Sequence, residues 1–395
     1  MEIAFLGDSF LFDNSTGVNG TQVQMYNLAK AFADRGLGIH YVSLTKNEKQ
    51  DSENVEGIEI HWIKSNFEIF SWLKEVSDFR KVLNSIKPDV VYQRGRSYLT
   101  YVGGAWAEKN NKYFVWGSNG EDSCDFWKGI LRLRKSKRPL WRKLILYPYF
   151  GIQDVLIHRG IRKANCVINQ TDYQRARLLK NYGKKGIIIP SYFRLGHSNT
   201  NEKRSKHCLW VGNLSPNKQP EIFLRLAQHC KALADWKFIL VGGTKDERYW
   251  SYLVKESVLS ANVAMTGNVP FNQMDTYFAD ASLFVNTSNM EADGISNAMI
   301  QAWLHGVPVL SLNHDPNDWI TGKRLGFCAK GDLKAFLSTG YRMLQDVDAL
   351  EEMGKSCAEF AKNTFASDKI MDHYVEILRQ LSKNENLLCN ELSLQ

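Results

Sequence analysis

Residues 286–310 hold the polar groups best placed for chemistry, within the pattern of a strand, a loop and a helix. The apolar run at 281–286 predicts a buried strand. Ser296 is a favourable N-cap for a helix whose apolar side recurs at helical spacing, and Gly306 ends that helix before a further strand over 307–312. The loop and the helix N-terminus therefore lie at the carboxyl edge of a parallel sheet, where backbone N–H groups and the helix dipole favour an anion.

Three polar side chains of this stretch are spaced four residues apart and point roughly the same way, namely Asp293, Asn297 and Gln301. The stretch resembles the acidic signature of retaining glycosyltransferases of the GT-B fold, most closely glycosyltransferase family 4. In that signature two Glu are separated by seven residues. Here Asp293 and Gln301 stand at those positions and Glu291 lies two residues before the first. The other matching positions are Gly294, Asn297, Gly306 and Pro308, while Ser296 replaces a Pro. Taken alone, the stretch also fits an ordinary strand–helix unit of any α/β protein.

Other parts of the chain resemble the same family in the same order. The segment 212–218 resembles the turn whose Arg and Lys bind the donor's diphosphate, with Lys218 at the Lys position and Asn213 in place of the Arg. The loop 267–271, which contains Val269, corresponds to the segment that holds the nucleobase. Gly17 and Gly20 match the first Gly-rich loop, where the backbone approaches phosphates and sugar. Each of these matches alone is weak, and each residue has an ordinary surface role as its alternative.

The resemblance implies transfer of a sugar from a nucleoside-diphosphate sugar, UDP- or GDP-linked, to a hydroxyl group with retention of configuration. It implies no metal and no further cofactor, because cationic side chains and a helix N-terminus stabilise the leaving diphosphate. Lys218 would contact the phosphates with help from Asn213, and Gln301 would contact the ribose. Asp293, or Glu291 if the register shifts, would hold the sugar hydroxyls. The backbone amides expected to support phosphate and sugar are those of Gly294, Ile295, Ser296 and Asn297.

The acceptor side is less well defined. Many family members carry a His just after the strand that we expect at 113–116, and this chain has none there. Asn119, Glu121 and Asp122 are the candidates for that space. The nine His of the chain show no spacing typical of a metal site, and no Ser-His-Asp set is apparent.

Alternation of strands and helices predicts an α/β protein of GT-B architecture, with two Rossmann-like, doubly wound domains facing a central cleft. We expect an acceptor-binding domain at 1–190, a polar linker at 191–206 and a nucleotide-sugar domain at 207–365. A final helix at 366–381 would pack back on the first domain, followed by a tail at 382–395.

The composition of the chain indicates which broad class of protein it belongs to. The 395 residues are 44% hydrophobic, which suits two globular domains and excludes a disordered chain. Seven scattered Cys indicate a reducing compartment rather than a disulfide framework. No signal peptide pattern and no run of apolar residues long enough for a membrane span is present. We therefore expect a cytoplasmic protein.

The basic charge of the chain is local. Residues 126–153 contain eight Lys or Arg and no Asp or Glu, and the whole chain has a net charge of +8. Aromatic and aliphatic residues alternate with these cations: Phe126, Trp127, Leu133, Trp141, Leu144, Tyr147 and Phe150. This predicts an amphipathic surface helix on an anionic membrane. The alternative is a solvated basic flank whose aromatics pack into the domain, and a nucleic-acid surface is disfavoured because no binding module surrounds it.

Three functions are compatible with these observations. The first is a retaining transferase at the inner membrane face that acts on a glycan or lipid-linked acceptor in cell-surface polysaccharide or glycolipid synthesis. The second is another GT-B enzyme, such as a nucleotide-sugar 2-epimerase or a transferase with a soluble acceptor. The third is a non-catalytic nucleotide-sugar-binding or scaffold protein, which the changes at Asn213, Asp293 and Gln301 favour.

Overall fold

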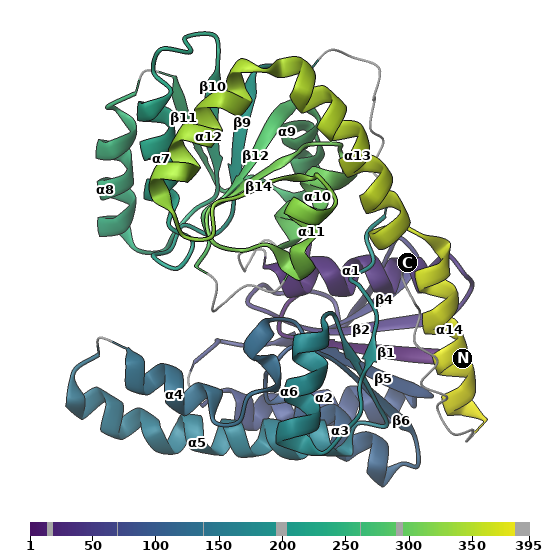
Figure 1. Cartoon of the computed structure of the whole chain (residues 1–395). Helices are drawn as coiled ribbons and strands as arrows, with labels where there is room; N and C mark the ends of the chain where they lie inside the picture. Colours follow the sequence, from purple (N-terminus) through teal and green to yellow (C-terminus); the bar gives the residue numbers. More distant parts are fainter. Residues whose placement is uncertain are drawn as a thin grey trace. The chain divides into compact units, whose positions relative to one another are not determined.

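The computed structural model describes residues 1–13, 19–68, 70–136, 138–194, 204–260, 262–289 and 295–383. The chain divides into two compact units (Figure 1). The first contains Met1–Arg194 and Ser367–Gln395, and the second contains Leu195–Ala366. Most of the expected linker and nearly all of the expected tail lie outside the described residues.

Within the described residues, the first unit has an eight-stranded sheet in the order β3-β4-β2-β1-β5-β6-β7-β8. Neighbouring strands are parallel, except that β3 runs antiparallel to β4. Five of the six residues of β1 are buried, as expected for a strand covered on both faces. The strands are β1 (Glu2–Gly7), β2 (Gly38–Thr45), β3 (Ser52–Val55), β4 (Ile58–Lys64), β5 (Val90–Arg94), β6 (Tyr113–Gly117), β7 (Cys166–Asn169) and β8 (Ile187–Ile188).

Helices connect these strands and cover the sheet, and their apolar sides form a core with β1, β2, β5 and β6. Their bounds are α1 (Gly20–Ala33), α2 (Trp72–Ile86), α3 (Leu99–Lys109), the 3-10 turn η1 (Glu121–Cys124), α4 (Lys128–Lys135), α5 (Leu140–Lys163) and α6 (Asp172–Tyr182).

The last helix, α14 (Asp368–Ser382), belongs to the first unit although it follows the second in sequence. Its Tyr374 is buried and meets Phe32 of α1 edge to face, with ring centroids 5.9 Å apart. Arg35 Nη2 lies 2.6 Å from Asp368 Oδ1 at the start of α14. Through these contacts the C-terminal helix packs on the N-terminal unit.

The second unit has a six-stranded parallel sheet in the order β11-β10-β9-β12-β13-β14, within the part of the chain that the structure describes. A core cluster of this unit packs one face of the sheet against the helices at 220–229, 247–257 and 333–345. The strands are β9 (His207–Val211), β10 (Lys237–Val241), β11 (Val263–Gly267), β12 (Ala281–Asn286), β13 (Val309–Ser311) and β14 (Gly326–Cys328). The helical elements are α7 (Pro220–His229), α8 (Glu247–Ser257), η2 (Phe271–Gln273), α9 (Met274–Asp280), α10 (Asn297–Leu304), η3 (Pro316–Asp318), α11 (Trp319–Gly322), α12 (Leu333–Gln345) and α13 (Val347–Phe365).

The predicted GT-B architecture of two Rossmann-like units is confirmed, and one detail of the basic stretch differs. It forms two helices, α4 and α5, rather than one. α4 ends with Ser136 as its C-cap, and Pro139, which has no N–H to continue a helix, immediately precedes α5. Among the described residues, no helix is both long enough and apolar enough to cross a membrane.

Candidate functional site

The order of the strands determines where a ligand site forms in the second unit. β9 lies between β10 and β12, so the connections from β9 and β12 leave the sheet in opposite directions. Ligands of doubly wound sheets bind outside the carboxyl ends of the strands at such a switch point. The segment 212–218 follows β9, and the segment 287–296 follows β12. The sheet therefore brings together the two stretches that the sequence marks as donor-binding.

Hydrogen bonds join these two stretches directly. Thr287 Oγ1 donates to the carbonyl of Lys218 at 2.6 Å and accepts from Trp210 Nε1 of β9 at 2.9 Å. The Asn289 N–H donates to the carbonyl of Asn217 at 2.9 Å. These bonds fix the backbone of Lys218 beside the loop that leads into α10. The Lys218 residue itself is half-buried. Asn213 is exposed at the start of the same turn.

Helix α10 begins at Asn297, with Ser296 at the expected N-cap position in an extended conformation. The Ser296 side chain makes no capping hydrogen bond, so the cap is backbone geometry alone. Ile295 is buried, and it anchors the start of the helix to the core. Gln301 is half-buried one turn into α10. The positive end of the helix dipole thus lies at the carboxyl edge of the sheet, where it favours a phosphate.

The loops after β10 and β11 reach the same edge. Gly242 has a φ of +144°, and a Cβ atom there would lie 1.9 Å from the carbonyl oxygen of Gly212. Its N–H donates to the carbonyl of Gly267 at 2.9 Å. Val269 is half-buried in the loop after β11. Only glycine at 242 permits this close approach of three loops around the predicted donor site.

Four residues of the predicted site lie outside the described residues. They are Gly17, Glu291, Asp293 and Gly294. The predicted donor-site residues that the structure describes in the second unit are Asn213, Lys218, Val269, Ile295, Ser296, Asn297 and Gln301.

A second group of polar residues lies at the corresponding edge of the first unit, and sequence reasoning missed it. β1 is the switch point of that sheet, between β2 and β5. Asp8 follows β1, and Ser97, after β5, donates a hydrogen bond to the Asp8 carboxylate. The signal was present in the sequence as an acid directly after the first strand, but its partner Ser97 is remote in the chain.

A buried carboxylate, Glu75 of α2, accompanies Asp8. Glu75 accepts hydrogen bonds from Ser71 Oγ and from the Tyr98 hydroxyl, both at 2.6 Å, and from Ser65 Oγ. Tyr149 of α5 is also close. Burial is the main cause that raises the pKa of Tyr149, and the charges of Glu75 and Asp8 raise it further. Asp8 is exposed by its accessible surface, whereas its carboxylate lies close to many protein atoms, which desolvate it. That desolvation raises the pKa of Asp8 to about 6, the Ser97 hydrogen bond lowers it, and the charge of Glu75 raises it.

The raised pKa of Asp8 predicts a specific pH dependence of stability. Between the ordinary pKa of 3.8 and about 6, the folded state binds more protons at Asp8 than the unfolded state does. Asp8 therefore makes its whole contribution to the free energy of unfolding below this pH window, and that contribution is lost as pH rises through the window. We expect Asp8→Asn to raise the melting temperature relative to the parent protein at about pH 7 and to do so less at about pH 4.5. An equal difference at both values would contradict this assignment.

The three acceptor-side candidates that follow β6, namely Asn119, Glu121 and Asp122, have different surroundings. Asn119 Nδ2 donates to Thr21 Oγ1 at the start of α1, close to Gly20 and to Gly95. Burial raises the pKa of Glu121, which accepts a hydrogen bond from Thr171 at 3.3 Å. Asp122 instead pairs with Lys128 and Arg132 of α4. Asn119 is thus placed at the Gly-rich segment, whereas Asp122 is held by ion pairs to α4.

Helices α4 and α5 lie side by side along the first unit (Figure 1). We call residues 126–163 the basic hairpin. Phe126 packs against the core, as the alternative interpretation expects for the aromatics, and Leu133 is buried. Trp141, Leu144 and Ile145 instead are each more than half exposed. One side of α5 therefore presents large apolar groups to solvent among exposed cations, which are Arg132, Arg134, Lys135, Arg138 and Arg142.

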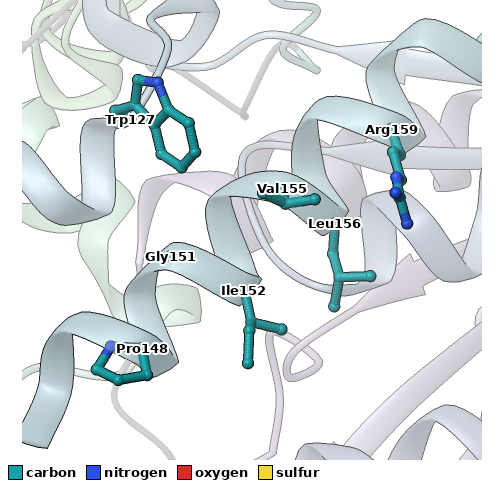
Figure 2. A pocket seen from close by; sticks show the side chains of 7 residues that line it. All are labelled: Trp127, Pro148, Gly151, Ile152, Val155, Leu156 and Arg159. Atoms are coloured by element: carbon teal, nitrogen blue, oxygen red, sulfur yellow. The ribbon is translucent and has the colours of Figure 1, made fainter.

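The exposed side of α5 also has an apolar depression (Figure 2). Trp127, from the loop before α4, faces the turns of α5 that carry Gly151 and Ile152. Its remaining lining residues are Pro148, Val155, Leu156 and Arg159. Arg159 at one end is the charged group of the lining. The arrangement suits a hydrocarbon segment with an anionic group at its end.

The basic hairpin is fixed to the first unit by one buried ion pair. Arg96 Nη2 lies 2.9 Å from Asp154 Oδ1, and the two side chains are only 7% and 4% exposed. Asp154 also accepts the backbone N–H groups of Gly129 and Ile130, each at 3.1 Å. These are N–H groups of the first turn of α4, so Asp154 of α5 caps α4.

Two family models match the chain, one in each unit. The model "Glycosyl transferases group 1" matches residues 205–346, and "Glycosyl transferase 4-like" matches residues 17–127. Together with two Rossmann-like units, these matches define a protein of the GT-B class. The chain belongs to the glycosyltransferases of this class, with a group 1 domain as its second unit.

Solved structures share the fold along nearly the whole chain. Sucrose-phosphate synthase (tll1590) from Thermosynechococcus elongatus is 17% identical with a TM-score of 0.73, and the match covers 97% of this chain and 100% of that one. HepE (Alr3699) from Anabaena, in complex with UDP and glucose, is 16% identical with a TM-score of 0.68, with 96% and 100% covered. An uncharacterized 41.2 kDa protein in the cps region of Klebsiella pneumoniae is 23% identical over 193 residues. That match spans 47% of this chain and about half of the relative, 50%.

Proposed function

We propose that the protein transfers a sugar from a nucleoside-diphosphate sugar, UDP- or GDP-linked, to a hydroxyl of a glycan or lipid-linked acceptor with retention of configuration. The observation that carries this is the placement of Lys218. Its backbone is hydrogen-bonded to the loop before α10 at the switch point of the second sheet. A cation and a helix N-terminus then lie at one edge, which suits a diphosphate. HepE, whose crystals contain UDP and glucose, shares this fold.

The proposed chemistry is electrostatic. As the bond between the sugar and the diphosphate breaks, negative charge grows on the phosphate oxygens, and Lys218 with the α10 dipole stabilises it. Gln301 would bind the ribose, since an amide accepts from one hydroxyl and donates to the other. Asp293 or Glu291 would hold the hydroxyls of the transferred sugar. This mechanism needs no metal ion.

The acceptor would bind at the carboxyl edge of the first sheet. Asp8 is solvent-accessible there and hydrogen-bonded to Ser97, and the ionised carboxylate accepts hydrogen bonds from hydroxyl groups. Tyr149 places α5 beside this group. An acceptor whose sugar reaches Asp8 could thus keep its lipid portion near the basic hairpin.

The direct test is a transfer assay with UDP- and GDP-linked sugars and a mixture of lipid-linked and oligosaccharide acceptors. We expect acceptor-dependent release of the nucleoside diphosphate, and NMR of the product should show the donor's anomeric configuration. Inversion would contradict the proposed mechanism. Release of a free, epimerised sugar would indicate the alternative nucleotide-sugar 2-epimerase.

We further propose that the basic hairpin binds anionic membranes at the inner membrane face, which would make the protein a peripheral membrane enzyme of cell-surface glycan synthesis. Exposed apolar side chains of this size on one helix side are unusual for a surface that stays in water. The cations around them would interact with anionic lipids, each contributing about 1 kcal/mol near the membrane. Arg142 lies 5.0 Å from the Trp141 ring, so cation and aromatic group would enter the interface together.

Replacing Trp141, Leu144 and Ile145 together with Ser should weaken binding to vesicles of phosphatidylglycerol by at least about tenfold, because their burial in the lipid interface is lost. Flotation with such vesicles measures this. The matched control replaces Val258 and Leu259 with Ser, since both are also more than half exposed but lie outside the basic hairpin. Equal binding of the triple variant and the parent protein would contradict a membrane role for α5.

A further inference from the structure

Two His and one Glu meet in the amino-terminal half of the first sheet, away from the edge that carries Asp8. His40 lies on β2 and pairs in register with Glu59 of β4, while His61 lies two residues further along β4. Residues at i and i+2 of a strand point to the same face, so the three side chains share one face of the sheet. The spacing in sequence gave no sign of this group, because only the pairing of β2 with β4 brings it together.

The three groups have the separations expected around a small cation. His40 Nδ1 lies 3.0 Å from His61 Nε2 and 3.3 Å from Glu59 Oε2. His61 Nε2 lies 3.7 Å from Glu59 Oε1. Ligands about 2.0–2.1 Å from a tetrahedral ion are about 3.3 Å apart. The three observed distances lie on both sides of this value. One ion at the centre of the triangle would contact all three groups.

The other nitrogen of His40 has the partner typical of a metal-bound His. His40 Nε2 lies 3.1 Å from Glu2 Oε2. Metal-ligating His residues usually donate their second ring N–H to a carboxylate, which fixes the tautomer and the ring. Gly38 makes room for this carboxylate, because a Cβ atom there would lie 2.0 Å from Glu2 Oε2. The side chains of His40 and His61 are only 16% and 15% exposed, whereas that of Glu59 is 46% exposed and leaves the site open to solvent.

We propose that His40 Nδ1, His61 Nε2 and the Glu59 carboxylate bind one divalent transition-metal ion of the Zn²⁺ type, with water as the fourth ligand and Glu2 positioning His40. Two imidazoles and a carboxylate favour Zn²⁺ over Mg²⁺, which prefers oxygen ligands. Because the site joins β2 to β4 in the amino-terminal half of the sheet, its expected role is structural. It is independent of the proposed transferase chemistry.

The test uses the full chain after treatment with EDTA and dialysis. Isothermal titration with ZnCl₂ should show one ion bound per chain, and Zn²⁺ should raise the melting temperature while Mg²⁺ does not. His61→Asn and His40→Asn should abolish the Zn²⁺-dependent shift. His229→Asn, in the second unit, is the control and should keep it. Glu2→Gln leaves all three ligands in place and should weaken Zn²⁺ binding by about 10–100-fold.

Two results would overturn the proposal. One is the absence of both heat and melting shift with Zn²⁺ in the parent protein. The other is Zn²⁺ binding that persists unchanged in His40→Asn and His61→Asn, which would locate the ion elsewhere. If a His variant fails to fold, Glu59→Gln decides the question, since it keeps the shape of the side chain and removes the charged ligand. Unchanged affinity in Glu59→Gln would then contradict the site.

Discussion

Replacing Lys218 with Ala is expected to lower the rate of sugar transfer by about 10²–10³-fold, the loss typical when one preorganised charge-stabilising group is removed. The expected loss is large because Asn213 stands where the family has a second cation and cannot neutralise charge. The backbone of Lys218 should stay in place, since Thr287 bonds to its carbonyl rather than to its side chain. We therefore expect the melting temperature without ligand to change little.

Turnover with the preferred donor measures this effect. Lys231→Ala is the matched control, because Lys231 is an exposed Lys beyond the end of α7. Lys218→Arg should retain part of the activity, since it keeps the positive charge. Full activity of Lys218→Ala would remove the proposed mechanism. If the parent protein binds a donor but shows no turnover, the non-catalytic alternative is favoured.

Replacing Asp154 with Ala is expected to lower the free energy of unfolding of the first unit by about 3–5 kcal/mol, the usual loss when one partner of a buried ion pair is removed. Arg96 would keep its bonds to the carbonyls of Ser123 and Asp125, at 3.1 and 2.7 Å, and to the Tyr182 hydroxyl at 3.4 Å, none of which carries a negative charge. The N–H groups of Gly129 and Ile130 would also lose their acceptor. The basic hairpin should loosen from the sheet as a consequence.

Urea denaturation followed by tryptophan fluorescence measures this loss. Asp172→Ala is the control, because Asp172 forms an exposed pair with Arg175 within α6, and such pairs contribute about 0–1 kcal/mol. A change in Asp154→Ala no larger than that of the control would contradict the role of Asp154. Proteolysis within 128–150 should accelerate in the Asp154 variant and not in the control.

Much of the sheet structure could be predicted from the sequence, because buried parallel strands appear as short apolar runs between turn residues. The predicted strand at 281–286 has the bounds that the structure gives, and β1 and β9 are apolar runs of the same kind. Caps are local in the same way, since the Thr171 side chain at the start of α6 accepts from the N–H of Gln174 at 3.2 Å. These features depend on residues close together in the chain.

Features that depend on pairing between distant residues could not be predicted. The edge strand β3 has little apolar pattern, since three of its four residues are exposed. Asp8 with Glu75, and His40 with His61, meet only once the sheet has formed.

The most direct test of the central claim is donor binding, measured as a thermal shift with UDP, GDP, ADP and CMP and with their common sugar conjugates. A ligand at a hundred times its dissociation constant adds about 2.7 kcal/mol to stability, which raises the melting temperature by a few degrees. We predict a shift with UDP or GDP, a larger one with one of its sugars, and a smaller one in Lys218→Ala. No shift with any of these ligands, or equal shifts in the parent protein and Lys218→Ala, would contradict a donor site at Lys218.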